Sequence, residues 1–160
     1  MTESAKPLSH LTDTGEVHMV DVGAKETTAR RAVAEAEVVM SSGLIERFFQ
    51  NDLPKGDAAA VARVAGITAA KKTADLIPLC HPLPLDGVEV GLSPTGHGIR
   101  VLATVSTTGR TGVEMEALTA VSIAALTIYD MVKGVEREVE IRSVRLLEKS
   151  GGRSGSWTRS

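Results

Sequence analysis

Charged residues flank the most apolar stretch of this chain. Ala117–Tyr129 contains no charged residue, Glu114 and Glu116 precede it, and Asp130 and Lys133 follow it. Carboxylates and ammonium groups in such positions can move protons to and from a substrate as general acids or bases. The same residues also have a structural interpretation, because acidic side chains suit a helix N-terminus and Asp130 and Lys133 suit a surface ion pair. The residues alone leave both interpretations open.

A proline-rich segment holds further reactive side chains. The stretch from Asp75 to Val90 reads DLIPLCHPLPLDGVEV and contains His81 and Cys80, the only cysteine of the chain. Because proline fixes φ and removes a backbone donor, the segment is predicted to be a stiff, irregular connection between a helix and a strand. A stiff backbone that holds an imidazole indicates a binding site, although a lone cysteine is usually a small hydrophobic residue. The histidines and the cysteine lack the spacing of a zinc site, so no metal site is predicted.

Basic residues indicate where an anion could bind. Lys55 and Gly56 directly precede a predicted helix N-terminus, which presents free N–H groups and a partial positive charge. Arg30, the TTGRTG loop and the KSGGRSG segment add further positive charge. The spacing is not that of a P-loop, and each segment is also typical of a solvated loop. A phosphate site is therefore a hypothesis at this point.

Alternating apolar residues predict the strands that position these groups. Over residues 29–40 apolar residues recur at every second position, which favours a strand over the helix that the Ala and Glu content would allow. Residues 86–92 and 98–106 also alternate and form a predicted hairpin. A final strand over 137–149 has its alternation shifted near Ser143, which indicates a bulge. Residues 17–22 are predicted to be a short strand or an extended segment.

Helical periodicity predicts three helices. The first follows a serine cap, the second begins after Asp57 and ends near Ala74, and the third ends near Lys133. The predicted buried faces are Leu44, Ile45, Phe48 and Phe49 in the first helix and Val61, Val64, Ala65 and Thr68 in the second. The third helix is apolar on all sides, so it is predicted to be buried all round. In a domain this small we expect a second copy of the chain to cover one side.

The order strand, helices, hairpin, helix, strand predicts an α+β fold. It matches a ferredoxin-like split βαβ sandwich, with a mostly antiparallel sheet and helices packed on one face. The expected divisions are a flexible arm over 1–16, a single catalytic domain over 17–148 and a Gly/Ser-rich basic tail over 149–160. In a straight third helix Glu116 and Asp130 would be about 21 Å apart. If both act on a substrate, the site is shared between chains or there are two sites.

Length and composition limit the function classes. The chain has 160 residues, of which 42% are apolar and 2% aromatic, and its net charge is −2. One domain with a core of small aliphatic side chains is expected, and no overall field draws it to nucleic acid or to a membrane. A single cysteine fits a reducing compartment, residues 1–10 lack the apolar stretch of a signal peptide, and no membrane span is apparent. We therefore expect a cytoplasmic protein without nucleic-acid or membrane partners.

Longer motifs resemble one family. HMVDV, PKGD, ARVAGI, DLIPLCHPL, TGVEMEALTA, ALTIYDM and RLLEKSGGRSG occur in this order and together resemble the MoaC family of molybdenum cofactor biosynthesis. The resemblance implies a cyclic pyranopterin monophosphate synthase, which is a phosphorus–oxygen lyase. Its substrate is a cyclised dihydro-GTP made by a radical GTP cyclase, and it releases pyrophosphate. The resemblance also implies a ferredoxin-like homohexamer, a trimer of dimers, with sites at the dimer interface.

The resemblance further implies the site residues. The catalytic positions of the family match Asp130, Lys133 and Lys55. The substrate-binding positions match Leu79, Cys80, His81, Met115, Glu116, Glu114, Arg30 and Lys149. Arg153 stands where many relatives have lysine, so proton donation is not expected there, because arginine stays protonated. No cofactor is implied, and the sequence carries no indication of Mg²⁺ with the triphosphate.

On this basis Asp130 is the expected general acid or base, and Lys133 should lower its pKa unless burial offsets the effect. Lys55 and Arg30 are expected to hold the triphosphate, while His81 and Glu116 orient the base or relay protons. Two alternatives remain: a non-catalytic nucleotide- or pterin-binding oligomer, and a structural oligomer without a ligand. The second leaves the charges around the apolar helix unexplained.

Overall fold

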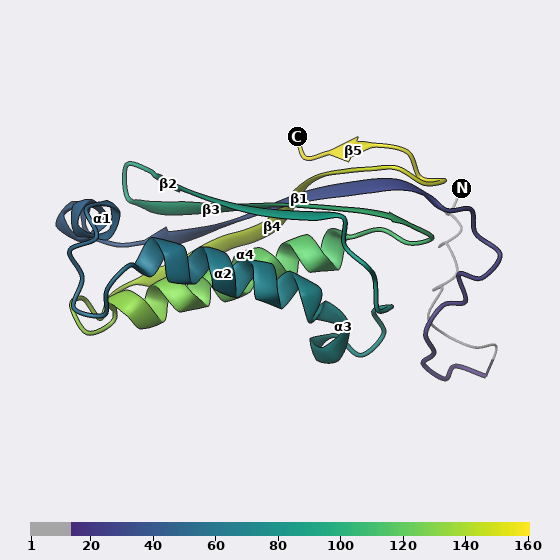
Figure 1. Cartoon of the computed structure of the whole chain (residues 1–160), viewed down its shortest axis with the longest axis horizontal. Coiled ribbons are helices and arrows are strands. Elements are labelled where there is room, and N and C mark those ends of the chain that lie inside the picture. The colour runs from purple at the N-terminus through teal and green to yellow at the C-terminus, as the bar shows by residue number, and fades with distance from the viewer. Residues whose placement is uncertain (1–13) are drawn as a thin grey trace, which may run out of the picture.

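The computed structural model describes residues 14–160 and shows an antiparallel sheet with its long helices on one face (Figure 1). The strands are β1 (Thr28–Val39), β2 (Gly87–Pro94), β3 (Gly98–Gly109), β4 (Glu140–Ser150) and β5 (Trp157–Thr158). They stand in the order β2-β3-β1-β4-β5 across the sheet. The helices are α1 (Ser42–Phe49), α2 (Ala58–Lys71), α3 (Thr73–Leu76) and α4 (Glu114–Val132). Since α2 leads from β1 to β2 and α4 leads from β3 to β4, the strands form split βαβ units, which confirms the predicted ferredoxin-like α+β fold.

Strand β1 places a row of small residues against the helices. Ala32, Ala34, Ala36, Val38 and Met40 are all buried, as the alternation predicted. The facing residues of β3 are buried as well, so the core is built from alanine and branched aliphatic side chains. Small side chains let the helices approach the sheet closely, which gives a dense core with few aromatic residues.

The predicted buried face of α2 is wrong. Val61 and Val64 are exposed, and Ala58, Ala62 and Gly66 are buried instead. A Cβ atom at Gly66 would lie 3.0 Å from the carbonyl oxygen of Ala120 on α4. The two helices therefore pack at short range through their smallest residues, and the larger valines cannot occupy that face.

The helix boundaries follow their capping residues. Ser41 Oγ accepts the N–H of Leu44 at 3.4 Å, and Asp57 Oδ1 accepts the N–H of Ala60 at 2.9 Å. In α1 the predicted face is correct except for Phe49, which is 40% exposed. Helix α2 ends at Lys71 rather than near Ala74, and residues 73–76 form the separate turn α3.

Strand β4 contains two irregularities in its pairing with β1. Ser143 adopts φ +56°, and Ser143 and Val144 together face the single residue Ala36, which confirms the predicted bulge. A second shift lies beside Leu147, since Ala34 pairs with Leu146 while Val33 pairs with Glu148. The segment after β4 was predicted to be a flexible tail, but it turns back and adds β5 to the edge of the sheet.

The N-terminal part of the chain adds no regular strand. Most of the predicted arm lies outside the described residues. Residues 17–22, predicted to be a short strand or an extended segment, contain only a single bridge residue, Val17. They run along one end of the sheet (Figure 1).

Helix α4 lies between the sheet and solvent rather than being covered on all sides. Its sheet-facing residues Val121, Ala125, Ile128 and Val132 are buried, whereas Leu126 is 54% exposed. Its length and composition would suit a membrane span, with a mean hydropathy of 1.4, but 56% of that window is buried in the fold. One side of the helix therefore remains open to a partner.

Candidate active site

Helix α4 separates the predicted site residues into two groups. Asp130 and Lys133 lie at its C-terminal end, whereas Glu114 and Glu116 lie in its first turn. At a rise of ~1.5 Å per residue, Glu116 and Asp130 are about 21 Å apart along the axis. One chain therefore carries two separate clusters, and a small substrate cannot touch both within it.

The C-terminal cluster consists of Asp130 between two lysines. Lys133 Nζ lies 2.7 Å from Asp130 Oδ1, and Lys55 Nζ lies 3.0 Å from Asp130 Oδ2. Lys55 Nζ also donates to the backbone carbonyl of Asp130 at 2.7 Å. A turn closed by Gly56, with φ +91°, brings Lys55 back toward α4 just before α2 begins.

The two lysines fix the charge of Asp130. Hydrogen bonds from Lys133 and then from Lys55 lower the pKa of the Asp130 carboxyl, and Asp130 in turn raises the pKa of Lys133. Burial contributes little, because all three side chains are about half exposed. Asp130 is thus an anion that can accept a proton, while the lysines are cations that can donate one or stabilise negative charge.

The N-terminal cluster is more buried. Glu116 is 4% exposed, and burial, followed by the charge of Glu114, raises its pKa. Cys80 lies near it, since burial and then the charge of Glu116 raise the pKa of the Cys80 thiol. Glu116 can therefore hold a proton more readily than an ordinary glutamate, as a general acid must. The thiol, by contrast, is held in its weakly nucleophilic form.

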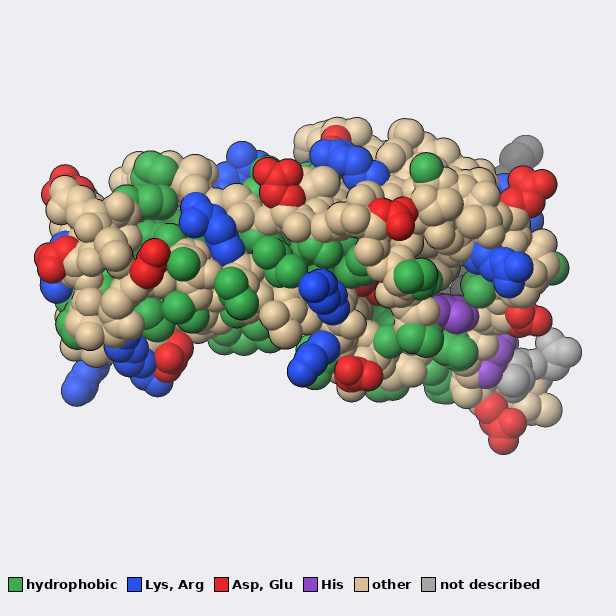
Figure 2. Space-filling model, viewed as in Figure 1, with side chains coloured by type: hydrophobic (Ala, Val, Ile, Leu, Met, Phe, Trp, Pro, Cys, Tyr) green, Lys and Arg blue, Asp and Glu red, His purple; other side chains and the backbone are tan. Residues whose placement is uncertain are grey.

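The proline-rich segment positions His81 at the same end of the molecule. His81 Nε2 lies 2.7 Å from the carbonyl oxygen of Val20, so this nitrogen carries the proton and donates it. The segment is tied to β3 where Thr107 Oγ1 donates to the carbonyl of Pro84 at 2.5 Å. Histidine side chains appear at this end of the surface in Figure 2. The connection between α3 and β2 is irregular, as predicted.

Arg30, Glu114 and Lys149 line a cavity of about 800 Å³ beside the first turn of α4. Lys149 Nζ lies 3.1 Å from Glu114 Oε1. Arg30 donates to the backbone carbonyls of Gly109 at 3.4 Å and Arg110 at 3.3 Å. The structure therefore brings these three predicted residues together, but it separates Arg30 from Lys55, which lies at the other end of α4.

Sequence reasoning missed part of this cavity. Lys25 lines it and was not singled out, and Arg110 belongs to a loop that had been noted only for its charge. Arg153 was named, but only as a position that keeps a positive charge. No motif marks Lys25, because it is brought to the cavity by the approach of the N-terminal segment to the β4–β5 loop. Leu79 and Met115, in contrast, do not line the cavity.

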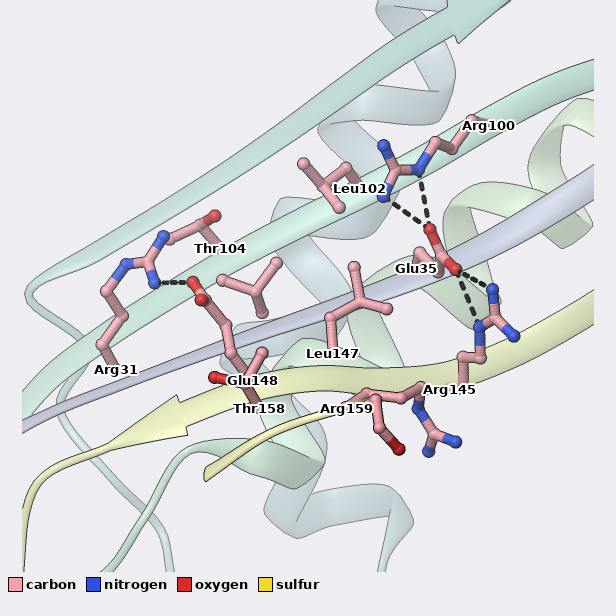
Figure 3. A pocket seen from close by; sticks show the side chains of 12 residues that line it. Arg31, Glu35, Arg100, Leu102, Thr104, Arg145, Leu147, Glu148, Thr158 and Arg159 are labelled. Atoms are coloured by element: carbon pink, nitrogen blue, oxygen red, sulfur yellow. Dashed lines mark hydrogen bonds and ion pairs between the residues drawn. The ribbon is translucent and has the colours of Figure 1, made fainter. Parts of the chain in front are cut away.

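A second cavity, of about 630 Å³, lies on the sheet face that carries no helix (Figure 3). Glu35 lies there between two arginines, with Oε2 2.7 Å from Arg100 Nη2 and Oε1 2.6 Å from Arg145 Nη2. Burial would raise the pKa of Glu35, but the hydrogen bonds from Arg145 and Arg100 outweigh it and the pKa is lowered. All predicted site residues lie elsewhere, and the fully paired Glu35 has a structural role.

Among residues 14–160 no three His, Cys, Asp or Glu side chains converge as a metal ion would require. The absence of a cofactor requirement stays a prediction.

Comparison with known proteins gives a consistent result. A family model described as the MoaC family matches residues 19–152. A protein of Chloroflexus aggregans named cyclic pyranopterin monophosphate synthase is 55% identical over 99% of this chain and 98% of its own length. A protein with the same name from Roseiflexus castenholzii is 56% identical over 92% of this chain and 95% of its own length. One from Corynebacterium glutamicum is 54% identical over 94% of this chain and 97% of its own length. The resemblance seen in the motifs is confirmed.

Proposed function

Because this chain belongs to the MoaC family, we propose that it is a cyclic pyranopterin monophosphate synthase of molybdenum cofactor biosynthesis. It converts a cyclised dihydro-GTP, supplied by a radical GTP cyclase, to cyclic pyranopterin monophosphate and releases pyrophosphate. The observation that carries the proposal is the pair of clusters on α4. One holds an ionised carboxylate between two lysines, and the other holds a buried glutamate with a raised pKa.

The two clusters suit the proton transfers that the reaction needs. Rearrangement of the purine-derived ring requires a base and an acid at different atoms. Asp130 is the base, Lys133 and Lys55 supply positive charge and protons, and Glu116 is the acid. His81, whose Nε2 donates to the carbonyl of Val20, keeps Nδ1 for a contact with the substrate.

Closure of the cyclic phosphate follows as a phosphoryl transfer. A hydroxyl oxygen of the substrate forms a bond to the α-phosphorus, and the bond from that phosphorus to the α–β bridging oxygen breaks. The bonding electron pair leaves with pyrophosphate, and the hydroxyl proton passes to a base. Fixed cations near the phosphates stabilise the charge that develops on the departing oxygen.

We also propose that the active unit is an oligomer, a homohexamer built as a trimer of dimers, with the site at the dimer interface. Two observations support a shared site: the separation of the clusters along α4, and the exposed apolar side chains on the helix layer. Val64 on α2 is 64% exposed and Leu126 on α4 is 54% exposed. Hydrophobic side chains appear over the face that carries α2 in Figure 2. A two-fold axis across antiparallel copies of α4 would bring Asp130 of one chain to Glu116 of the next.

The direct test is turnover. The purified protein is incubated with the cyclised triphosphate, and pyrophosphate and pterin fluorescence are followed. Formation of both supports the proposal. Tight binding of the substrate without either product supports the alternative, a non-catalytic nucleotide- or pterin-binding oligomer. Absence of binding and of turnover contradicts both.

The shared site is tested by mixing inactive chains. Asp130→Asn and His81→Ala chains carry lesions at opposite ends of α4, so a mixed dimer has one doubly altered site and one intact site. Random mixing of equal amounts should restore about a quarter of the sites. The matched control mixes Asp130→Asn with Lys55→Ala, which alter the same cluster, and should restore none. Equal recovery in both mixtures, or none in either after proven subunit exchange, contradicts a shared site.

A cytoplasmic location is part of the proposal, supported by the single cysteine, which fits a reducing compartment. The expected small-molecule substrate needs no nucleic-acid or membrane partner. No cofactor is assigned, and Mg²⁺ dependence is measured most simply by repeating the turnover assay with a chelator.

A further inference from the structure

The C-terminal residues form one wall of the cavity beside the first turn of α4 and then leave it. Residues 151–154 line that cavity. The chain then turns back, and β5 pairs with β4 at the edge of the sheet (Figure 1). Trp157 and Arg159 lie outside the described lining of the cavity, and Arg159 lines the cavity on the helix-free face instead (Figure 3). The segment therefore connects the candidate active site with the helix-free side of the sheet.

The wall is built from residues with much conformational freedom. Gly151, Gly152 and Gly155 all adopt positive φ. Glycine loses more backbone entropy than any other residue when its conformation is fixed. A Cβ atom at Gly151 would collide with the carbonyl oxygen of Ala29, so the near end of the loop lies directly against β1. A loop with three glycines is well ordered only when its far end is anchored as well.

Strand β5 supplies this far anchor, although it has only two residues. Trp157 pairs with Lys149 across the edge of β4. Arg159 adds two hydrogen bonds, because its backbone N–H donates to the carbonyl of Leu147 at 2.7 Å and its Nε donates to the carbonyl of Leu146 at 2.7 Å. Two donors of one residue on two successive carbonyls fix the position of β5 along β4.

The side chains of Arg159 and Trp157 also contact each other. The guanidinium carbon of Arg159 lies over the indole ring, 5.6 Å from its centroid. A cation in this position is attracted by the electrons of the ring. Arg159 is therefore held from two sides, by the backbone of β4 and by the ring of Trp157, and the loss of either residue should loosen β5.

We propose that Trp157 and Arg159 form a clamp, and that this clamp positions residues 151–154 as a wall of the active site. The role in the reaction rests on the proposed function. With the clamp in place, the wall is ordered before the substrate arrives, so binding does not have to order it. Without the clamp, the substrate would bind only to the fraction of molecules whose wall is in place, and the apparent affinity would fall by that fraction. Asp130 lies at the other end of α4, so the effect is expected in KM rather than in kcat.

The first test follows the wall itself, by amide hydrogen exchange in the full chain. In Arg159→Ala, exchange over residues 151–156 should become about 10-fold faster, because the far anchor is weakened. Trp157 is the only tryptophan of the chain, so its fluorescence anisotropy reports on β5 and should fall in the same variant. Arg63→Ala, at an exposed arginine of α2, is the matched control and should change neither signal. Unchanged exchange over residues 151–156 in Arg159→Ala overturns the proposal.

The second test is kinetic. Arg159→Ala and Trp157→Ala should each raise KM about 10-fold and leave kcat within about two-fold of the parent. Trp157→Ala does not alter the net charge, so an equal effect of both variants excludes the loss of a positive charge as the cause. Trp157→Phe keeps an aromatic face for Arg159 and should keep KM within about two-fold of the parent. Parental KM values in both alanine variants, or a loss in kcat alone, overturn the positioning role.

Failure of the clamp and failure of the proposed function give different results. A parent protein without turnover overturns the proposed function, while faster exchange over residues 151–156 in the alanine variants still supports the clamp. A parent that turns over, with alanine variants of unchanged KM, overturns the clamp alone.

Discussion

The carboxylates at the two ends of α4 have pKa values that are shifted in opposite directions. Asp130, at the C-terminal end, is exposed and its pKa is lowered by Lys133 and Lys55, whereas Glu116, in the first turn, is buried and its pKa is raised. The helix dipole alone would favour the reverse, because it stabilises anions at the N-terminus and cations at the C-terminus. Direct ion pairs and burial therefore outweigh the dipole. A carboxylate's position along a helix does not set its protonation; its immediate partners do.

The largest effect is expected from Asp130→Asn, which removes the ionised carboxylate at the C-terminal end of α4. Turnover should fall by about 10³-fold, because asparagine cannot accept a proton. Asp130 is about half exposed, so folding and substrate binding should be retained. The measurement is kcat at saturating substrate, with circular dichroism as a check on folding.

A matched control is available close by. Asp57→Asn alters another exposed aspartate beside the same cluster, and asparagine caps a helix as well as aspartate does. It should leave kcat unchanged. Near-normal turnover in Asp130→Asn, or an equal loss of turnover in Asp57→Asn, would contradict the role of Asp130 as the base.

Gly66→Val should disturb the clusters at both ends of α4. The new side chain would meet Ala120 and Ala124 on α4, and overpacking of this kind costs about 2 kcal/mol of unfolding free energy. Because α2 follows Lys55 and leads to the His81 segment, both kcat and KM should worsen in the folded variant. Urea titration measures the loss of stability.

The control for this change is Gly43→Ala in α1, where no atom lies within 4 Å of the new Cβ. It should not reduce stability. If Gly66→Val is as stable as the parent, the close contact of α2 and α4 does not fix the relation between the two clusters.

Lys133→Met tests the C-terminal end of α4 through the pH dependence of kcat/KM. Asp130 must be ionised to act as a base, and the hydrogen bond from Lys133 keeps it ionised at lower pH. Without Lys133 the pKa of Asp130 rises, so the acidic limb of the residual kcat/KM profile should move to higher pH. Lys133→Arg should keep the limb near its original position. An acidic limb that stays in place in Lys133→Met would assign it to another group.

The smallest effect is expected from Glu116→Gln on stability. Because the pKa of Glu116 is raised in the folded state, the ionised carboxylate destabilises the fold at pH values above its unfolded pKa of 4.5. This destabilisation disappears as the pH falls through the folded pKa. Glutamine carries no charge, so the variant should melt at a higher temperature than the parent at about pH 7 and at the same temperature at about pH 4. Calorimetry at the two pH values measures the difference.

Glu46→Gln, at an exposed glutamate of α1, is the control and should show no such dependence on pH. A Glu116→Gln variant that is less stable at neutral pH would mean that the ionised carboxylate is stabilised by a contact that outweighs its burial.

Much of the fold could be predicted because its determinants are local. The alternation of β1 and the caps at Ser41 and Asp57 are each contained in a few residues, and all were correct. The buried face of α2 was wrong because hydrophobicity ranks valine above alanine and glycine, whereas the short distance to α4 selects the smallest side chains. That distance is a property of two segments, and neither segment reveals it alone.

The candidate site was partly visible for the same reason. The charges at the ends of α4 stand out against an uncharged helix, so their separation followed from the helical rise. The bond between Lys55 and Asp130 joins residues that are 75 positions apart, and no local pattern pairs them. Lys25 reaches the cavity only through the folding of the N-terminal segment, so no spacing in the sequence could have assigned it.

The irregular pairing of β4 has a consequence for residues beyond it. Strand residues normally alternate between faces, yet Arg142 and Arg145 both pair with glutamates on the helix-free face, because Ser143 and Val144 share one position. If Ser143 and Val144 occupied two regular positions instead of sharing one, every residue from Arg145 to Lys149 would be inverted. Lys149 would then turn toward the helix-free side. The cavity beside the first turn of α4 would lose an ammonium group although none of its own residues had been substituted.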